Sequence, residues 1–249
     1  MFPIRDHNPS RRTPYVTWVL IAINVLVFVL TLPYYSDEAR LVAYFDDFAL
    51  VPARITAGDG YLTFLTSMFM HGGLMHLAGN MLFLWIFGDN LEDQFGHLPF
   101  LGFYLASGIG AGLAQYLAST VSTVPMVGAS GAIAGVMGGY LLMFPRARVD
   151  VLIILIIIVR LVPMPAYVML GFWFALQVGS GWVNYGVDGG GVAYLAHAGG
   201  FIVGLVLALP FWLRAGGPDF WSRTHGKPPH PETTANWRTS PVPTVRRRR

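Results

Sequence analysis

Four polar residues with the chemistry of a hydrolase lie in stretches that are otherwise apolar. Ser130 occurs in "GASG", His197 in "AHAGG", and His76 and Asn80 share the segment "HGGLMHLAGN". A strongly polar side chain is costly in an apolar environment, so it suggests function unless a structural partner satisfies it. A serine becomes a nucleophile when a histidine takes its proton, and N–H donors can then stabilise the oxyanion.

Each of these residues also has a structural interpretation. Histidine and asparagine can hydrogen-bond neighbouring membrane helices, and a serine flanked by glycine and alanine commonly serves helix packing. A zinc site would need His71, His76 and His197 together. The spacing of five between His71 and His76 does not match H-E-x-x-H, and no cysteine is present, so we expect no metal.

The spacing of glycines favours catalysis over packing alone. Gly131, Gly135 and Gly139 recur every four residues after Ser130, while Gly200 and Gly204 fall on the same helix face as His197. Two such small-residue faces allow close helix contact, which would bring Ser130 and His197 together at similar depth. No carboxylate is placed to orient His197, so the prediction is a Ser-His dyad. Backbone amides near Ser130, with His76 and Asn80, would supply the oxyanion donors.

The elements that must position these residues are membrane helices. Of 249 residues, 54% are hydrophobic and 12% are charged, far fewer charged residues than in a soluble domain. The sequence therefore predicts an all-α polytopic membrane protein whose six-helix bundle has spans at 15–32, 64–88, 98–118, 126–144, 164–180 and 193–213. Within the second span, Gly72 and Gly73 are expected to mark the start of the regular helix. The nine-residue stretch "VLIILIIIV" (151–159) is too short to cross and is expected to be interfacial or re-entrant.

The arginines favour both termini in the cytoplasm. They concentrate in residues 1–14, near 146–148 and after 213, as the positive-inside rule requires for six crossings. We expect a cytoplasmic tail over 1–14, the membrane domain over 15–213 and a disordered, basic, proline-rich tail over 214–249. Span 15–32 is expected to be a signal anchor and not a cleaved leader. The arginines lie in tails and loops, so nucleic-acid binding is not expected.

Taken together, "HGGLMHLAGN", "GASG" and "AHAGGFIVG" resemble the motifs of the rhomboid intramembrane serine proteases, over roughly residues 15–213. The resemblance implies Ser130 as nucleophile, His197 as general base, and His76, Asn80 and the Ser130 amide as the oxyanion hole. Gly128 matches the first glycine of the serine motif, Gly200 and Gly204 match the glycines after the base, and Glu92 resembles a glutamate that ties helix ends. The sequence departs from some members at Leu62-Thr63, in place of a Trp-Arg pair, and at Ala134, in place of a tyrosine stacked on the base.

The expected function is hydrolysis of transmembrane protein substrates in or near their membrane segments, without a cofactor, in contact with lipid, most simply in a prokaryotic plasma membrane. The alternative is a non-catalytic protein that binds transmembrane segments in the same cavity. A transporter is disfavoured because the spans lack a midplane acid. The glycine-rich loop 181–191 is expected to be either a movable cap or a plain connection. The sequence indicates neither the natural substrate nor the oligomeric state.

Overall fold

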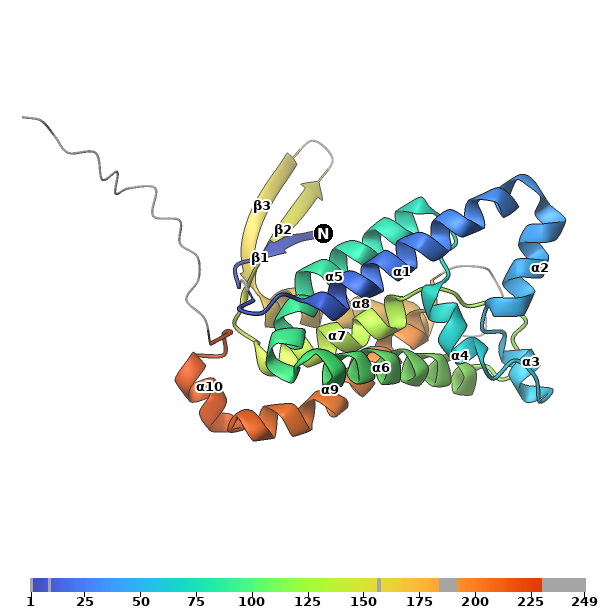
Figure 1. Ribbon diagram of the computed structural model, residues 1–249. Helices are drawn as coiled ribbons and strands as arrows, with labels where there is room; N and C mark the ends of the chain where they lie inside the picture. Colours follow the sequence, from blue (N-terminus) through green and yellow to red (C-terminus); the bar gives the residue numbers. More distant parts are fainter. Residues whose placement is uncertain (1, 9, 156–157, 184–191, 230–249) are drawn as a thin grey trace, which may run out of the picture.

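A computed structural model describes residues 2–8, 10–155, 158–183 and 192–229, and its main body is a helical bundle (Figure 1). Six helices of 14 or more residues form the bundle within this described part. They are α1 (Tyr15–Thr31), α5 (Leu74–Phe95), α6 (His97–Ala118), α7 (Ser130–Met143), α8 (Ala166–Val183) and α9 (Tyr194–Ala215).

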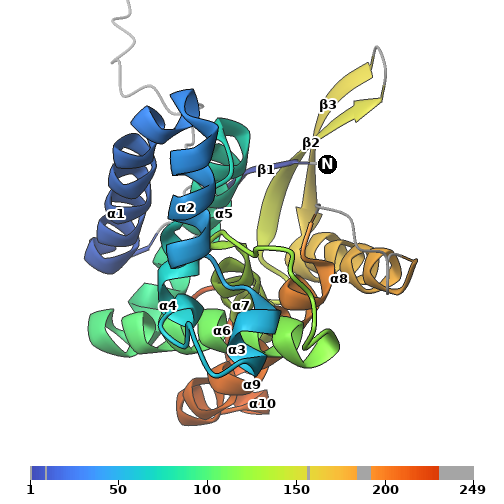
Figure 2. The ribbon, with the colours of Figure 1, turned by 90° about the vertical axis from the view of Figure 1, so that its right-hand side faces the viewer.

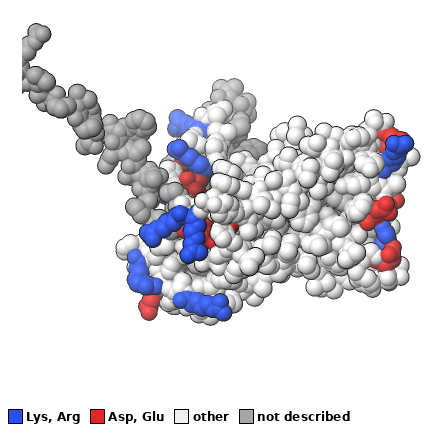
Figure 3. Space-filling model, in the orientation of Figure 1, with Lys and Arg blue, Asp and Glu red and all other residues white. Residues whose placement is uncertain are grey.

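The helix surfaces and the charge distribution identify a multi-pass membrane protein. Among the described residues, four helical segments are long and apolar enough to cross a bilayer: Tyr15–Ser36, His97–Ala118, Ala166–Val183 and Tyr194–Ala215. α5 has the length but carries Asp89, Glu92 and Asp93 near its end. On the face seen in Figure 3, charged side chains gather at the two ends and leave a white band between them. Arg11 and Arg12 lie near Asp93 at the end of α5, and Arg214 is in the last turn of α9.

α7 lies in the middle of the bundle, with α1 and α8 on opposite sides (Figure 2). Every residue from Ala132 to Tyr140 is buried, which is unusual for an outer membrane helix. At 1.5 Å per residue its 14 residues extend about 21 Å, less than the roughly 30 Å of a hydrocarbon core. One end of α7 therefore lies inside the protein, below the level that the longer helices reach.

Short elements at the opposite end of the molecule connect α1 to α5. They are the 3₁₀ helices η1 (Leu32–Ser36) and η2 (Ser67–Phe69) and the helices α2 (Glu38–Phe48), α3 (Pro52–Thr56) and α4 (Thr63–Thr66). Leu50 and Met126 exchange backbone hydrogen bonds of 3.0 and 2.8 Å, and the Gly128 N–H donates to Ser67 O at 2.9 Å. These bonds fix the chain that leads into α7.

The described residues of the stretch 151–159, expected to be interfacial or re-entrant, are strands, which were not predicted from the sequence. β2 (Arg148–Leu155) pairs antiparallel with β3 (Ile158–Pro165), with Val151 opposite Val162. The position of this stretch relative to a membrane stays a prediction. β1 (Phe2–Asp6) adds to β2, which gives the order β1-β2-β3, with Asp6 opposite Val149. A short run of isoleucine and valine fits a strand as well as a membrane segment, and its pairing with the distant N-terminus left no local signal. The protein is therefore mostly helical but not all-α.

Two predicted boundaries also need correction. α5 begins at Leu74, directly after the two glycines expected at its start, and continues to Phe95, so the predicted span 64–88 was shifted toward the N-terminus. The tail is helical at its start, since α10 (Pro218–Thr224) buries Phe220, and the indole of Trp221 donates to Leu142 O at 2.9 Å. Disorder from residue 214 was thus a wrong prediction for 214–229, and residues 230–249 lie outside the described part.

Glu92 on α5 caps the first turn of α1. Its carboxylate accepts the backbone N–H groups of Val16 and Thr17, both at 2.8 Å, and the Thr17 hydroxyl at 2.7 Å. The His97 imidazole lies 2.6 Å from the same carboxylate, and only 1% of Glu92 is exposed. The first amides of a helix have no acceptor within the helix, and α1 has neither a capping side chain nor an acidic residue in its first turn. The Glu92 carboxylate supplies this missing acceptor and negative charge.

We expect Glu92→Ala to destabilise the protein by about 3 kcal/mol, because it leaves buried donors at the start of α1 without an acceptor. Thermal unfolding of the purified protein in detergent measures the change. Glu38→Ala is the matched control, since Glu38 is an exposed glutamate in the first turn of α2. Equal shifts for the two variants would show that Glu92 is not a structural cap.

The N-terminal segment is held against α7 and α5 by a polar network around Asp6. The Tyr140 hydroxyl donates to Asp6 Oδ2 at 3.1 Å, and the Asn90 amide donates to the same oxygen at 2.8 Å. Asn8 donates to the Tyr140 hydroxyl at 2.9 Å. Burial, together with the nearby charge of Asp89, raises the pKa of Asp6 from 3.8 to about 7.

This raised pKa predicts a stability that falls as the pH rises. Between about pH 4 and 7 the folded protein keeps a proton on Asp6 that the unfolded chain has lost, so ionisation favours unfolding across that window. We expect the thermal midpoint to drop between pH 5 and pH 8, and Asp6→Asn to lessen the drop. Asp219→Asn, at an exposed aspartate on α10, should show the same drop of the thermal midpoint between pH 5 and pH 8 as the wild type. If the thermal midpoint of Asp6→Asn depended on pH as strongly as that of the wild type, Asp6 would not be the group responsible.

Candidate active site

Ser130 is the first residue of α7, and glycine shapes the turn that leads into it. Gly128 has φ +123°, and a Cβ there would lie 2.7 Å from His76 Nε2. Ile133 is the first residue of this turn to bond back along the chain, to Ala129 O at 3.0 Å. The backbone amides from Ser130 to Ala132 therefore have no acceptor within the helix. Such free amides at the start of a helix are a favourable arrangement for stabilising a negative charge.

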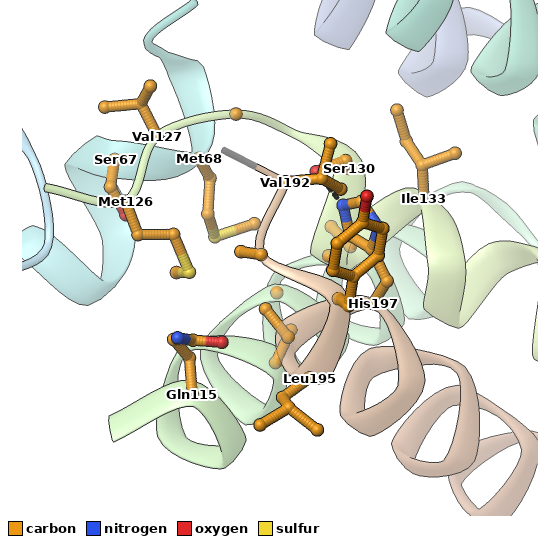
Figure 4. A pocket seen from close by; sticks show the side chains of 18 of the residues that line it. Ser67, Met68, Gln115, Met126, Val127, Ser130, Ile133, Val192, Leu195 and His197 are labelled. Atoms are coloured by element: carbon orange, nitrogen blue, oxygen red, sulfur yellow. Dashed lines mark hydrogen bonds between the residues drawn. The ribbon is translucent and has the colours of Figure 1, made fainter. Parts of the chain in front are cut away.

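His197 lies in the first turn of α9 and contacts Ser130 directly. Its Nε2 is 2.7 Å from Ser130 Oγ, a hydrogen-bond distance between residues 67 apart in sequence (Figure 4). The close approach of the helices depends on Gly200 and Gly204. A Cβ at either position would overlap the α7 backbone, at the carbonyl of Gly131 for Gly200 and at Gly135 for Gly204.

The glycines of α7 serve two neighbours, which differs from the predicted single ridge. A Cβ on Gly131 would lie 2.6 Å from Ala111 Cβ, and one on Gly135 would overlap Ser107, so these hydrogens face α6. Gly139 likewise faces Phe103 of α6, at 3.0 Å. Toward α9, the carbonyls of Gly131 and Gly135 meet Gly200 and Gly204, and Gly138 meets the Phe201 carbonyl. α7 is thus packed closely between two helices.

His76 and Asn80 lie one turn apart on α5 and line the same cavity as Ser130 and His197. Asn80 is 7% exposed, and its Nδ2 has no hydrogen-bond partner among the described residues. That Nδ2 would lie 3.6 Å from a Cβ on Gly128, two residues before Ser130. A buried amide donor without an acceptor is costly, so a ligand atom that accepts its hydrogen bond would be stabilised here. His71 packs edge-to-face on His76, with ring centroids 5.1 Å apart.

These residues surround a cavity of about 1020 Å³. Figure 4 shows Ser130 and His197 at one side of it, facing Met126 and Met68, with Gln115 of α6 farther along. Lining residues come from η2, α5, α6, α7, α8, α9 and the loop before α7.

The structure adds two contacts of His197 that the sequence did not predict. Gln177 of α8 places its Oε1 2.9 Å from His197 Nδ1, and the ring of Trp173 stacks on the imidazole, with centroids 5.9 Å apart at 30°. Trp173 thus covers the base, whereas Ala134, noted in the sequence as a departure from members with a tyrosine there, is a fully buried small residue of α7. A glutamine inside an apolar span was the available signal for Gln177.

Comparisons with known proteins identify the family of this chain. The Rhomboid domain family matches residues 59–214. Rhomboid protein 1, mitochondrial, of Saccharomyces cerevisiae is 29% identical over 198 residues, which is 77% of this chain and 51% of that protein. Rhomboid protease GluP of Bacillus subtilis is 34% identical over 205 residues, 79% of this chain and 36% of that protein. Rhomboid-like protein 11, chloroplastic, of Arabidopsis thaliana is 27% identical over 218 residues, 86% and 70% respectively.

The chain spans about half of the yeast relative and about a third of the bacterial one. The names of these relatives point to mitochondria and chloroplasts as well as to a bacterium, so they do not support the predicted prokaryotic plasma membrane over the others. The family match covers well over half of the chain and includes every helix of the cavity. This multi-pass membrane protein belongs to the rhomboid family.

Proposed function

We propose that the chain is an intramembrane serine endopeptidase that cleaves membrane proteins in or beside their transmembrane segments. The observation that carries the proposal is the 2.7 Å contact of Ser130 Oγ with His197 Nε2. The same cavity is lined by Asn80, whose Nδ2 has no hydrogen-bond partner in the part of the chain that the structure describes. The family includes proteins named as proteases, such as the Bacillus subtilis relative, which supports the same reaction class.

The chemistry follows from this arrangement. Ser130 Oγ attacks the scissile carbonyl while His197 Nε2 takes its proton, and the carbonyl electrons move to oxygen. Asn80 Nδ2, His76 and the Ser130 amide stabilise the oxyanion. His197 then gives its proton to the leaving nitrogen as the C–N bond breaks. Water attacks the acyl-serine by the same route in reverse, which releases the acid product and restores Ser130.

The substrate must be locally unwound where it is cut. A helical backbone shields its carbonyls in hydrogen bonds, so a nucleophile on one fixed side chain reaches only an extended segment. Ser130 is the first residue of a short helix and lines a cavity of about 1020 Å³, which supports access of such a segment to its hydroxyl. We therefore expect substrates with small or helix-breaking residues near the cleavage site. The arginine-rich end of the bundle supports a cytoplasmic location for both chain termini.

A cleavage assay tests the proposal. Purified protein in proteoliposomes is mixed with single-span test substrates that carry a helix-breaking residue, and product is followed by mass spectrometry. We expect wild-type protein to cleave and to react with a fluorophosphonate probe, and Ser130→Ala to do neither. Ser222→Ala is the matched control, because Ser222 is an exposed serine of α10 that does not line the cavity, and its loss should leave both signals intact.

The result that would contradict the proposal is cleavage no greater in the wild type than in Ser130→Ala across several substrates. Substrate capture without cleavage, measured by crosslinking from the cavity, would instead favour the non-catalytic binding protein.

A further inference from the structure

His197 makes two polar contacts, one through each ring nitrogen. Nε2 faces Ser130 Oγ at 2.7 Å and Nδ1 faces Gln177 Oε1 at 2.9 Å. A neutral imidazole carries its proton on one of these nitrogens, and the partner of one decides the state of the other. Only the form with the proton on Nδ1 leaves Nε2 free to accept the hydroxyl proton of Ser130.

We infer that Gln177 is a positioning residue that holds His197 in its basic tautomer. This inference rests on the proposed roles of Ser130 and His197. The amide oxygen of Gln177 only accepts hydrogen bonds, so it requires a hydrogen on Nδ1 and thereby leaves the lone pair on Nε2. Gln177 thus takes the place of a carboxylate next to the histidine, without a charge that the membrane interior would penalise.

The packing of α8 makes this contact specific. Trp173 and Gln177 are four residues apart and share one face of α8, so the indole covers the imidazole ring while the amide meets its edge. Phe174 stacks on Phe201 of α9, with centroids 4.7 Å apart, which holds the two helices together one turn beyond His197. Trp173 therefore restrains the tilt of the His197 ring, and the contact with Gln177 restrains its rotation about the bond to Cβ.

The direct test is the protonation pattern of the ring itself, read by ¹⁵N NMR of histidine-labelled protein. The Ser130→Ala background removes the serine, so that Gln177 is the polar partner left for His197, and a His197→Ala sample identifies its signals. With Gln177 present we expect a protonated Nδ1 and an unprotonated Nε2. Gln177→Leu should give a mixture of both forms, and Gln177→Glu should keep the Nδ1 proton, because its carboxylate also accepts.

Kinetics of the otherwise native protein provide the second test. We expect Gln177→Leu to lower kcat about 10- to 100-fold with little change in KM, as the base spends less time in its competent form. Gln177→Asn keeps the amide but draws its oxygen back from His197 by one carbon–carbon bond, about 1.5 Å. Its kcat should fall as far as that of Gln177→Leu. The kcat of Gln177→Glu should be closer to that of the wild type than the kcat of Gln177→Leu is. Leu176→Ala, a half-exposed neighbour on the same helix, is the control for general disturbance of α8.

The outcomes separate the two proposals. A protonated Nε2 in the presence of Gln177, or an unchanged pattern in Gln177→Leu, overturns the role of Gln177 whatever the activity. A kcat for Gln177→Leu equal to that of Leu176→Ala overturns it as well. If the tautomer changes with the Gln177 variants while the protein with native Ser130 cleaves no test substrate, the positioning role is supported and the proteolytic function is rejected.

Discussion

Ser130→Ala, His197→Ala and the double variant are expected to cleave a test substrate at the same residual rate, about 10⁴-fold or more below wild type. The two side chains act as one unit through the 2.7 Å contact between Oγ and Nε2. Removing either one removes the activated nucleophile, so a second deletion has nothing left to take away. Residual turnover would come from the oxyanion donors and from binding alone.

Single-turnover cleavage with protein in excess measures this effect without interference from product release. Ser222→Ala and His225→Asn serve as matched controls, since both residues are exposed, lie on or directly after α10 and do not line the cavity. If the double variant were far slower than either single variant, the two residues would act independently and the dyad would be wrong.

The second large effect is expected from a single methyl group between α7 and α9. Gly204→Ala would place a Cβ within overlap distance of the Gly135 backbone, where no flexible side chain can move aside. The helices must then separate, which we expect to destabilise the protein by about 1–3 kcal/mol or more. The same separation stretches the contact of Ser130 with His197, so the cleavage rate of the folded protein should fall about 100-fold.

Thermal unfolding and cleavage per folded molecule measure these two consequences separately. Gly102→Ala on α6 is the matched control, because a Cβ there meets nothing within 4 Å. It should leave activity intact and stabilise slightly, as alanine favours a helix more than glycine does. Equal behaviour of the two variants would mean that the α7–α9 approach does not position the dyad.

The N-terminal strand and α10 suggest how the end of the bundle opposite the cavity is secured. β1 pairs with β2, and Asp6 bonds Tyr140 in the last turns of α7. α10 bonds the last turn of α7 through Trp221. The helix that presents Ser130 at one end is therefore held at its other end by segments from both termini of the described chain. The falling stability of the Asp6 network with pH measures one of these attachments directly.

Local sequence patterns are sufficient to predict the membrane helices and the residues that meet at the cavity. Long apolar segments specify a helical bundle, because burial of backbone polar groups leaves helices as the viable spans. The arginines at one end predict its orientation. Ser130 and His197 could be paired from the sequence, since glycines at helical spacing mark faces where two backbones meet. The start of α5 after Gly73 followed from the same local rules.

Features that depend on distant partners arise only in the folded chain. β2 pairs locally with β3, but its other edge pairs with β1, nearly 150 residues earlier, and no local pattern encodes that partner. Gln177 became a contact of His197 only when α8 packed on α9 with Trp173 over the ring. Hydrophobic periodicity specifies which face of a helix is buried. Which side chain of a neighbouring helix then completes a hydrogen bond depends on the depth and rotation of both helices, and these are set by packing across the whole bundle.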